Sequence, residues 1–370
     1  MKANLTFTGD LLCYDSLTEK LNQKYDFCFE RATKLNKCDW LVGNLESPIA
    51  NEELKYTFER YCFNTPVSYI EAMKRCGFDM LTLANNHAMD RDEQGILNTL
   101  ENCRKTGLDT VGMYSSKAER DTIYIKEIRG IKVAIINYTY GVNSFAHNRF
   151  FKHKYMVNMF QPEETLKGSI HLLNSNEQIG ADLERIYFSG SDEFDIVRPY
   201  LAQLEEDIKR AKEAADYVVM VMHSGGQYND EVDPYSQFLA QKIKEYGADI
   251  IVGHHPHIIQ KSVVNNGYLT VFSLGNLLDD PMVVGEKPVD HTFNAVLHLS
   301  LDKDSGGKIT ARRQFSIYKI IVTDGKPQVI DSFDLYKEQP DQKLKEDILY
   351  FANRFANTDT IKTVQERYDI

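Results

Sequence analysis

The sequence has no excess of basic residues and no long apolar segment. Lysine and arginine number 43 against 54 aspartates and glutamates, which gives a formal net charge of −11 at pH 7. A protein that binds nucleic acid through its phosphates normally presents a basic face, so this charge argues against a nucleic-acid partner. No apolar run approaches the roughly 20 residues that span a bilayer, and the opening stretch MKANLTFTGDLL lacks the features of a secretory signal. We therefore expect no membrane-spanning segment and a cytoplasmic location.

Closely paired cysteines are also missing. The six cysteines all fall between Cys13 and Cys103, widely spaced and without a C-x-x-C pair. This pattern suits reduced thiols better than a disulfide framework or a zinc ribbon. The composition, 42% hydrophobic and 26% charged, is that of an ordinary globular protein without internal repeats or low-complexity tracts. A chain of 370 residues is long enough for two domains or for one large α/β fold.

The chain does have a regular alternation of short apolar strands and amphipathic helices. Apolar segments such as KVAIINY, YVVMVM and DIIV are typical of buried strands. Residues 66–77 are predicted to form a helix opened by Pro66 and closed by Gly77, and residues 92–107 a helix that ends at Gly107. Residues 199–216 and 234–247 have the same amphipathic pattern. The alternation predicts an α/β protein.

Potential metal ligands follow the apolar part of six of these strands. The segment GHHPHIIQ (residues 253–260) places three of the ten histidines within four positions after one strand. Each residue alone has an ordinary explanation as a helix cap, a turn residue or a hydrogen-bonded core histidine. Ligands of open α/β sheets collect beyond the carboxyl ends of the strands, so the shared placement favours a metal site. The residues so placed are Asp10, Glu46, Asn86, His87, His223, His255, His257 and Asn276.

The chemistry of such a cluster can be inferred from its ligand types. Carboxylate, amide-oxygen and imidazole ligands together suit manganese, iron or zinc rather than calcium. Two ions about 3.5–4 Å apart that share one carboxylate can hold a phosphoryl group and activate water. A histidine beside the ligands, such as His87, could protonate a leaving group or stabilise phosphoryl oxygens. If a helix starts here, Asp90 would share a face with His87 and hold its ring in one tautomer.

At these residues the sequence resembles the CapA family, which is named for poly-gamma-glutamate capsule synthesis and placed within the calcineurin-like metallophosphatase superfamily. Seven blocks carry the resemblance, in family order and between residues 7 and 277: FTGDLL, VGNLESPI, LANNHAMD, NYTYGVN, HSGGQY, GHHPHIIQ and FSLGN. The resemblance implies a four-layer α-β-β-α sandwich of the metallophosphatase type, with the site at the sheet edges. It implies one or two divalent metal ions and an acid or phosphate-contact role for His87. The metal ligands that it implies are Asp10, Glu46, Asn86, His223, His255 and His257.

Three features depart from the family pattern. Leu12 stands where the wider superfamily has the histidine of an Asp-x-His motif, a loss that CapA-like proteins generally share. Ser224 and Gln227 replace the tryptophan and the glutamate of a block that usually reads H-W-G-x-E-Y. The segment from Val142 to Val197 is unusually long and polar.

Leu12 predicts two unequal metal positions. Leucine cannot coordinate a metal ion, and an apolar wall disfavours a charge that lacks other partners. The position beside Asp10 would keep that carboxylate, the shared Glu46 and His257, whereas the position beside Asn86 loses no ligand. We therefore expect one firmly bound ion on the Asn86 side and a weaker ion on the Asp10 side.

Beyond Asn276 the family blocks stop. Residues 291–301, 309–322 and 327–333 are predicted strands with glycine-rich turns between them, which we expect to complete the second sheet. From residue 340 to the end the pattern is helical. The stripe of Leu344, Ile348, Phe351 and Phe355 is expected to pack on the core. We therefore divide the chain into a domain at 1–335, with an insertion at about 142–197, and a helical segment at 336–370. His291 and His298 have no companions and are taken as structural.

Residues 144–160, SFAHNRFFKHKYMVNMF, place basic side chains among aromatic ones in an otherwise acidic protein. Such an insertion is most often a solvated surface loop. Because it follows the carboxyl end of the strand KVAIINY, it is also placed to form a lid over the site. Arg149, Lys152 and Lys154 would then supply positive potential for an anionic substrate, and Asn44 and Asn276 are the other candidate substrate contacts.

Two functions are consistent with these features. The first is a metal-dependent hydrolase of a phosphoester or related anionic substrate, a small molecule or a polymer, with a link to poly-gamma-glutamate synthesis or processing. The second is a catalytically weakened protein that binds gamma-linked polyglutamate or helps to assemble it. The Asn86–His87 pair and the H-x-H histidines favour the first, whereas Leu12 and Gln227 favour the second. An anionic polymer would need local basic residues to approach a chain of this charge.

Overall fold

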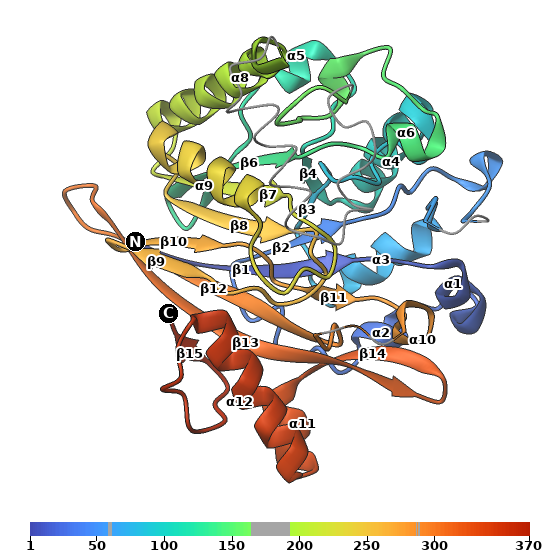
Figure 1. Ribbon diagram of the computed structural model, residues 1–370, viewed down its shortest axis with the longest axis vertical. Coiled ribbons are helices and arrows are strands. Elements are labelled where there is room, and N and C mark those ends of the chain that lie inside the picture. Colours follow the sequence, from blue (N-terminus) through green and yellow to red (C-terminus); the bar gives the residue numbers. More distant parts are fainter. Residues whose placement is uncertain (58–60, 164–192, 286, 288) are drawn as a thin grey trace.

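The computed structural model describes residues 1–57, 61–163, 193–285, 287 and 289–370, and within them two β-sheets pack face to face (Figure 1). The first sheet has the order β14 (Lys326–Asp331), β13 (Ile309–Thr323), β12 (Phe293–Lys303), β1 (Lys2–Leu11), β2 (Trp40–Leu45), β3 (Met80–Thr82) and β4 (Asp109–Val111). Two short strands extend it, since β11 (Asn276–Leu278) pairs with β1 and β15 (Tyr368–Asp369) pairs with β13. The second sheet has the order β5 (Ile125–Ile128), β6 (Ile131–Thr139), β7 (Tyr217–His223), β8 (Ile250–His254), β10 (Tyr268–Val271) and β9 (Val263–Asn265).

The alternation of side chains along the strands separates the inner faces of the sheets from the outer ones. In β7, Val219 and Val221 belong to the core between the sheets, whereas Val218 and Met220 face the helices outside. Because side chains alternate with a period of two, His223 at the end of β7 lies on the inner side. The same rule carries the last residue of β8, His254, to the inner side, since it follows Val252 by two positions.

Helices cover both outer faces and complete four layers. The helices α1 (Asp15–Leu21), α2 (Asp26–Phe29), α3 (Val67–Cys76) and α4 (Asp92–Thr106) pack on the first sheet, and α8 (Glu193–Ala214) and α9 (Pro234–Tyr246) pack on the second. The predicted helix ends are confirmed at Gly77 and Gly107, whose backbones take the left-handed conformation that ends a helix. The helix predicted from Pro199 begins earlier, at Glu193. The architecture is thus the expected α-β-β-α sandwich.

The strands after β11 join a different sheet from the one expected. They extend the first sheet, because β12 pairs antiparallel with β1 on the edge that β2 leaves open. The sequence shows that strands are present but not which edge they join. At the C-terminus α11 (Ser332–Glu338) and α12 (Gln342–Ala356) follow, and Ile348, Phe351 and Phe355 are buried in the core as predicted. The expectation of helix to the end of the chain is wrong, since α12 stops at Ala356 and β15 pairs with β13.

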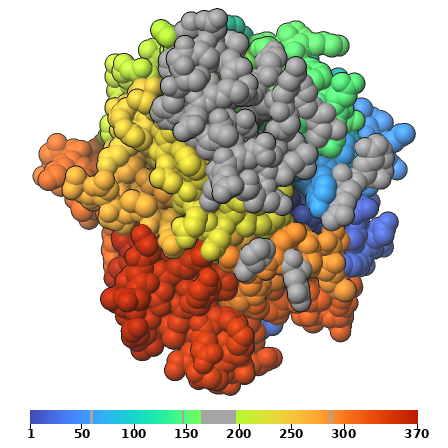
Figure 2. Space-filling model, viewed as in Figure 1, coloured from blue at the N-terminus to red at the C-terminus, as the bar shows by residue number. Residues whose placement is uncertain are grey.

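The C-terminal residues form one end of the molecule in the space-filling view (Figure 2). The remaining described elements are short: η1 (Glu52–Leu54), α5 (Lys117–Arg120), α6 (Ser144–His147), η2 (Lys154–Met156) and α10 (Pro281–Val284). All six cysteines are free thiols. In the part of the chain that the structure describes, no helix has the length and apolar character needed to cross a membrane.

Candidate metal centre

The parallel strands end side by side and bring polar residues of both sheets to one edge. In the first sheet Asp10 pairs in register with Asn44 of β2 and with Asn276 of β11. In the second sheet His223 pairs with His254. Two close approaches of the backbone require glycine here, because a Cβ on Gly9 would lie 1.9 Å from a backbone oxygen and a Cβ on Gly253 would lie 2.1 Å from another. The close backbone contacts at these two glycines therefore hold the strand ends that carry the candidate ligands.

The expected ligands fall into two groups that share Glu46. Their ligand atoms lie within 4.8 Å of one another in each group. One group is Glu46, His223 and His255, and the other is Asp10, Glu46 and His257. All five side chains are buried, with at most 3% of any of them exposed. The shared carboxylate is what a site for two ions needs.

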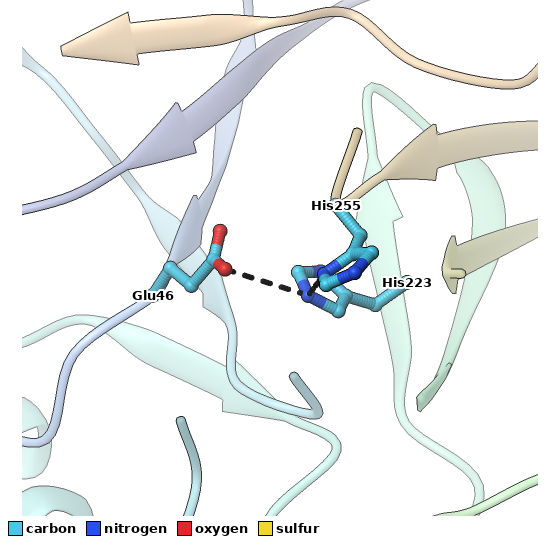
Figure 3. A group of neighbouring side chains, drawn as sticks. All are labelled: Glu46, His223 and His255. Atoms are coloured by element: carbon cyan, nitrogen blue, oxygen red, sulfur yellow. Dashed lines mark hydrogen bonds and ion pairs between the residues drawn. The ribbon is translucent and has the colours of Figure 1, made fainter. Parts of the chain in front are cut away.

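The Asn86 side of the centre is built around the Nε2 atom of His223. This atom lies 2.8 Å from Asn86 Oδ1, 3.1 Å from His255 Nδ1 and 3.6 Å from Glu46 Oε1. Figure 3 shows Glu46 approaching from one side and the two histidines from the other, with their polar atoms turned toward one another. Ligands bound at about 2.0–2.2 Å stand roughly 2.8–3.1 Å apart at adjacent positions of an octahedral ion and roughly 3.3–3.6 Å apart around a tetrahedral one, so the three distances lie in the range of ligands that share one ion.

The Asp10 side is assembled from three side chains. His257 Nε2 lies 3.7 Å from Glu46 Oε1, and His257 Nδ1 lies 3.4 Å from Asp10 Oδ2. The same Nδ1 is 2.9 Å from Asn276 Oδ1, which holds the ring with Nε2 toward Glu46. Leu12 occupies an apolar cluster with Tyr14 and Phe63, so no fourth protein ligand comes from that position.

Glu46 gives a test of whether a cation fits. Both of its carboxylate oxygens are buried, and neither has a hydrogen-bond donor among the described residues. Burial, together with the charges of Asp10 and Asp90, raises the pKa of Glu46 well above its usual range. Buried charges are normally paired or bound to metal. One or two divalent cations would therefore stabilise the ionised form of these carboxylates.

Two further ligands, Asp10 and His223, have pKa values that are shifted by their surroundings. Burial opposes ionisation of Asp10, but His254 and His257 outweigh it and hold the pKa of Asp10 well below its usual range. Burial lowers the pKa of His223 well below that of a free imidazole. Asp10 is therefore ionised and His223 neutral, the forms in which these groups bind metal ions.

The turn after β8 is strained in a way typical of functional sites. His255 and His257 have φ angles of +98° and +61°, which are unusual for residues other than glycine. Such conformations cost about 1–3 kcal/mol each and persist where the surroundings enforce them. Here the turn directs both side chains into the centre.

His87 stands beside the Asn86 side and contacts Asp90. Its Nδ1 lies 2.7 Å from Asp90 Oδ2, which also accepts a hydrogen bond from the backbone N–H of Phe63 at 2.7 Å. A helical face was the expected reason for this contact, but α4 starts only at Asp92, and a turn brings the two residues together. The arrangement leaves Nε2 of His87 as the atom that can give or take a proton.

The two candidate substrate amides are engaged with the protein. Asn44 Nδ2 donates to Asp10 Oδ1 at 2.7 Å, and Thr82 Oγ1 donates to the Asn44 oxygen at 3.2 Å. Asn276 contacts His257 and donates through Nδ2 to Asp279 Oδ2 at 2.6 Å. This geometry fits support of the ligands rather than contact with a substrate.

The predicted lid contributes to the edge of the site through its first part. Within residues 144–160, Arg149 Nη1 donates to the backbone oxygen of Asp90 at 2.7 Å. Directly before this segment, the backbone N–H of Asn143 donates to Asn86 O at 2.8 Å. Lys152 is exposed, and its backbone N–H is bound by a carboxylate of α4. Lys154 lines a separate cavity of about 250 Å³ beside α8. Residues 164–192 of the expected insertion lie outside the described residues.

A third group of potential ligands lies behind His87 but is poorly suited to a cation. It consists of Cys62, Asp90 and His147. Two guanidinium groups donate to the sulfur of Cys62, from Arg91 at 2.8 Å and from Arg149 at 3.0 Å. Two neighbouring positive charges oppose the binding of a third, so the group is better described as packing around Asp90.

Sequence reasoning did not assign His254 to the site. Its Nδ1 lies 3.0 Å from Asp10 Oδ1, and 3% of the residue is exposed. The signal available in the sequence was the parity of the strand, which places His254 on the inner face with Val252.

The two packed sheets, with carboxylate, amide and imidazole groups at their strand ends, define an α-β-β-α sandwich with a candidate metal centre. The chain belongs to the family described as bacterial capsule synthesis protein PGA_cap, whose model matches residues 4–281. This match confirms the resemblance to the CapA family.

Two curated relatives are similar over the same part of the chain. The PGA biosynthesis protein CapA of Bacillus subtilis (strain 168) is 28% identical over 279 residues, which cover 74% of this chain and 63% of that protein. The capsule biosynthesis protein CapA of Bacillus anthracis is 28% identical over 285 residues, which cover 75% of this chain and 60% of that protein. The aligned region thus spans about three fifths of the length of either relative.

Two solved structures are more distant. A hypothetical protein from Thermus thermophilus aligns with a TM-score of 0.40 at 14% identity, over 89% of this chain and 99% of that one. A provisionally assigned 5'-nucleotidase from Staphylococcus aureus, in complex with alpha-ketoglutarate, aligns with a TM-score of 0.40 at 13% identity, over 90% of this chain and 54% of that one. At these TM-scores we base no inference on either.

Proposed function

We propose that this protein is a metal-dependent hydrolase of a phosphoester or a related anionic substrate. The observation that carries the proposal is the convergence of Asn86 Oδ1, His255 Nδ1 and Glu46 Oε1 on His223 Nε2, at 2.8 to 3.6 Å. A purely structural cluster would pair these groups, whereas both Glu46 oxygens lack a donor among the described residues. The ligand types suit manganese, iron or zinc.

A bound divalent ion would supply Lewis acidity and a more acidic water molecule. The chain itself supplies the proton to the leaving group. Asp90 holds Nδ1 of His87 at 2.7 Å, which orients the ring and leaves Nε2 to donate. The backbone N–H of Asn143 on Asn86 O fixes the neighbouring ligand in the same way.

The named relatives connect this chemistry to capsule synthesis. One CapA protein is described as a PGA biosynthesis protein and the other as a capsule biosynthesis protein, and we propose a substrate or product linked to poly-gamma-glutamate synthesis or processing. A specific observation favours the alternative of a binding or assembly protein. Leu12 packs with Tyr14 and Phe63 and offers no ligand on the Asp10 side.

The test compares the wild type with His223→Ala, a variant that lacks one ligand of the Asn86 side only. Both proteins are stripped of metal, reloaded with manganese, iron or zinc, and assayed on a generic phosphomonoester and a generic phosphodiester. Metal-dependent hydrolysis by the wild type and its loss in His223→Ala support the proposal. A wild type that binds metal without hydrolysing any ester, but binds gamma-linked polyglutamate, supports the alternative.

A further inference from the structure

Asp10 meets different neighbours through its two carboxylate oxygens. Oδ2 lies beside the turn that carries the ligands His255 and His257, since it accepts a hydrogen bond from the backbone N–H of His255 at 3.2 Å and lies 3.4 Å from His257 Nδ1. Oδ1 faces away, toward Asn44 Nδ2 at 2.7 Å and His254 Nδ1 at 3.0 Å. One oxygen therefore lies beside the turn that carries two ligands, and the other lies beside supporting groups.

His254 contacts this carboxylate without joining the ligands. It ends β8 on the face between the sheets, and 3% of it is exposed. In the described part of the chain it belongs to neither ligand group at the centre. Its buried Nδ1 has no well-aligned hydrogen bond there, although the Asp10 oxygen is only 3.0 Å away. A small movement of the carboxylate would turn this contact into a direct hydrogen bond.

We propose that His254 is a positioning residue for the Asp10-side metal ion, which it serves by holding Asp10 with Oδ2 turned toward Glu46 and His257. The inference rests on the proposed metal centre. Because Leu12 offers no ligand, this side has the three candidate ligands Asp10, Glu46 and His257 among the described residues, so binding of the ion would depend strongly on the orientation of Asp10. Partners that orient a metal ligand typically contribute 10–100-fold in metal affinity.

The experiment is a titration of metal-free protein with manganese, without substrate. It compares the wild type with His254→Ala, His254→Asn and His254→Gln. The amide of asparagine can take the place of Nδ1, whereas the longer glutamine places its amide near the position of Nε2. We expect His254→Ala and His254→Gln to weaken the second ion about 10–100-fold, and His254→Asn to restore most of its affinity. The first, tightly held ion should be unchanged in all four proteins.

His298→Ala is the matched control for loss of a buried histidine. His298 is buried within the first sheet and contacts the hydroxyl groups of Thr6 and Ser316 at 3.2 and 2.8 Å, with no ligand beside it. Its removal should lower the melting temperature of the metal-free protein without changing the affinity for the second ion.

Equal affinities for the second ion in the wild type and in His254→Ala overturn the assignment, as does a wild type that binds no second ion. If His254→Asn melts normally but does not regain the affinity for the second ion, His254 does not position Asp10 through Nδ1, and the assignment is overturned. Failure of the proposed function gives a different result, namely a wild type that takes up manganese but hydrolyses no ester.

Discussion

The Asn86 side and the Asp10 side of the candidate centre share Glu46 but have different surroundings. On the Asn86 side Nε2 of His223 contacts an amide oxygen, an imidazole nitrogen and a carboxylate, and the acid candidate His87 stands next to the ligand Asn86. On the Asp10 side the position of a missing histidine is taken by Leu12 in an apolar cluster. From this difference we propose that the more firmly held ion and the proton donor belong to the Asn86 side, and that the Asp10 side holds the weaker ion.

Removal of the shared carboxylate should have the largest effect, because Glu46 is a candidate ligand on both sides of the centre. We expect Glu46→Ala to bind neither ion and to lose more activity than the ~10²–10³-fold that one stabilising donor costs. His223→Ala should lose the firm ion only, and His257→Ala the weak ion only. Metal analysis after dialysis and phosphoester turnover measure these losses. Retention of the firm ion in Glu46→Ala would show that the halves do not share this ligand.

His87→Ala separates proton transfer from metal binding within the Asn86 half. Loss of a general acid typically costs ~10²–10⁴-fold in turnover, and metal content should stay nearly unchanged. Phe63 serves as the matched control, since its ring centre lies 4.4 Å from that of His87 and the phenyl ring has no proton that it could transfer. Phe63→Leu should change turnover much less. Metal loss in His87→Ala would make His87 a ligand, and unchanged turnover would make it structural.

The features that the sequence predicts well are those that follow local rules. Gly77 and Gly107 end helices because they can take positive φ, and the strand parity of Val219 and Val221 carries His223 to the inner face. The grouping of ligands at the strand ends could be expected for the same reason, since parallel strands end at one edge.

Features that depend on distant partners could not be predicted. The role of Asn44 follows from a hydrogen bond to Asp10, a residue 34 positions away in the sequence. The sheet that β12 joins depends on the open edge of β1. The position of Arg149 depends on Cys62 and Asp90, which lie 87 and 59 positions away. Tertiary contacts of this kind leave no periodic pattern in the chain.

Leu12→His would make the two halves more alike. An imidazole at this position restores the ligand type that the wider superfamily has there, so the affinity of the weak ion should rise about tenfold or more, which corresponds to about 1.4 kcal/mol. The firm ion should be unaffected. Leu12→Ile, which keeps the apolar cluster with Tyr14 and Phe63, is the control. A manganese titration in which both variants match the wild type would mean that the unequal halves have another cause.

The basic residues of the segment at 144–160 should have the smallest effect, and their different positions allow a graded prediction. Lys152 is exposed beside the part of the segment that contacts Asp90, so Lys152→Glu should raise KM for an anionic substrate by about two- to tenfold and change kcat little. Lys154 lines a cavity beside α8, and Lys154→Glu should leave both constants nearly unchanged.

Arg149 differs from both lysines because it acts through a contact. Its guanidinium group donates to the backbone oxygen of Asp90 at 2.7 Å, next to the carboxylate that orients His87, so Arg149→Glu should lower kcat as well as raise KM. Added salt separates the two causes. It screens the long-range attraction between exposed charges, so the KM of the wild type should rise toward that of Lys152→Glu. The kcat defect of Arg149→Glu should persist at high salt, because a misplaced Asp90 is not a screening effect. If all three reversals change KM equally and salt removes every difference, the segment acts only as a charged surface and contributes nothing to the alignment of His87.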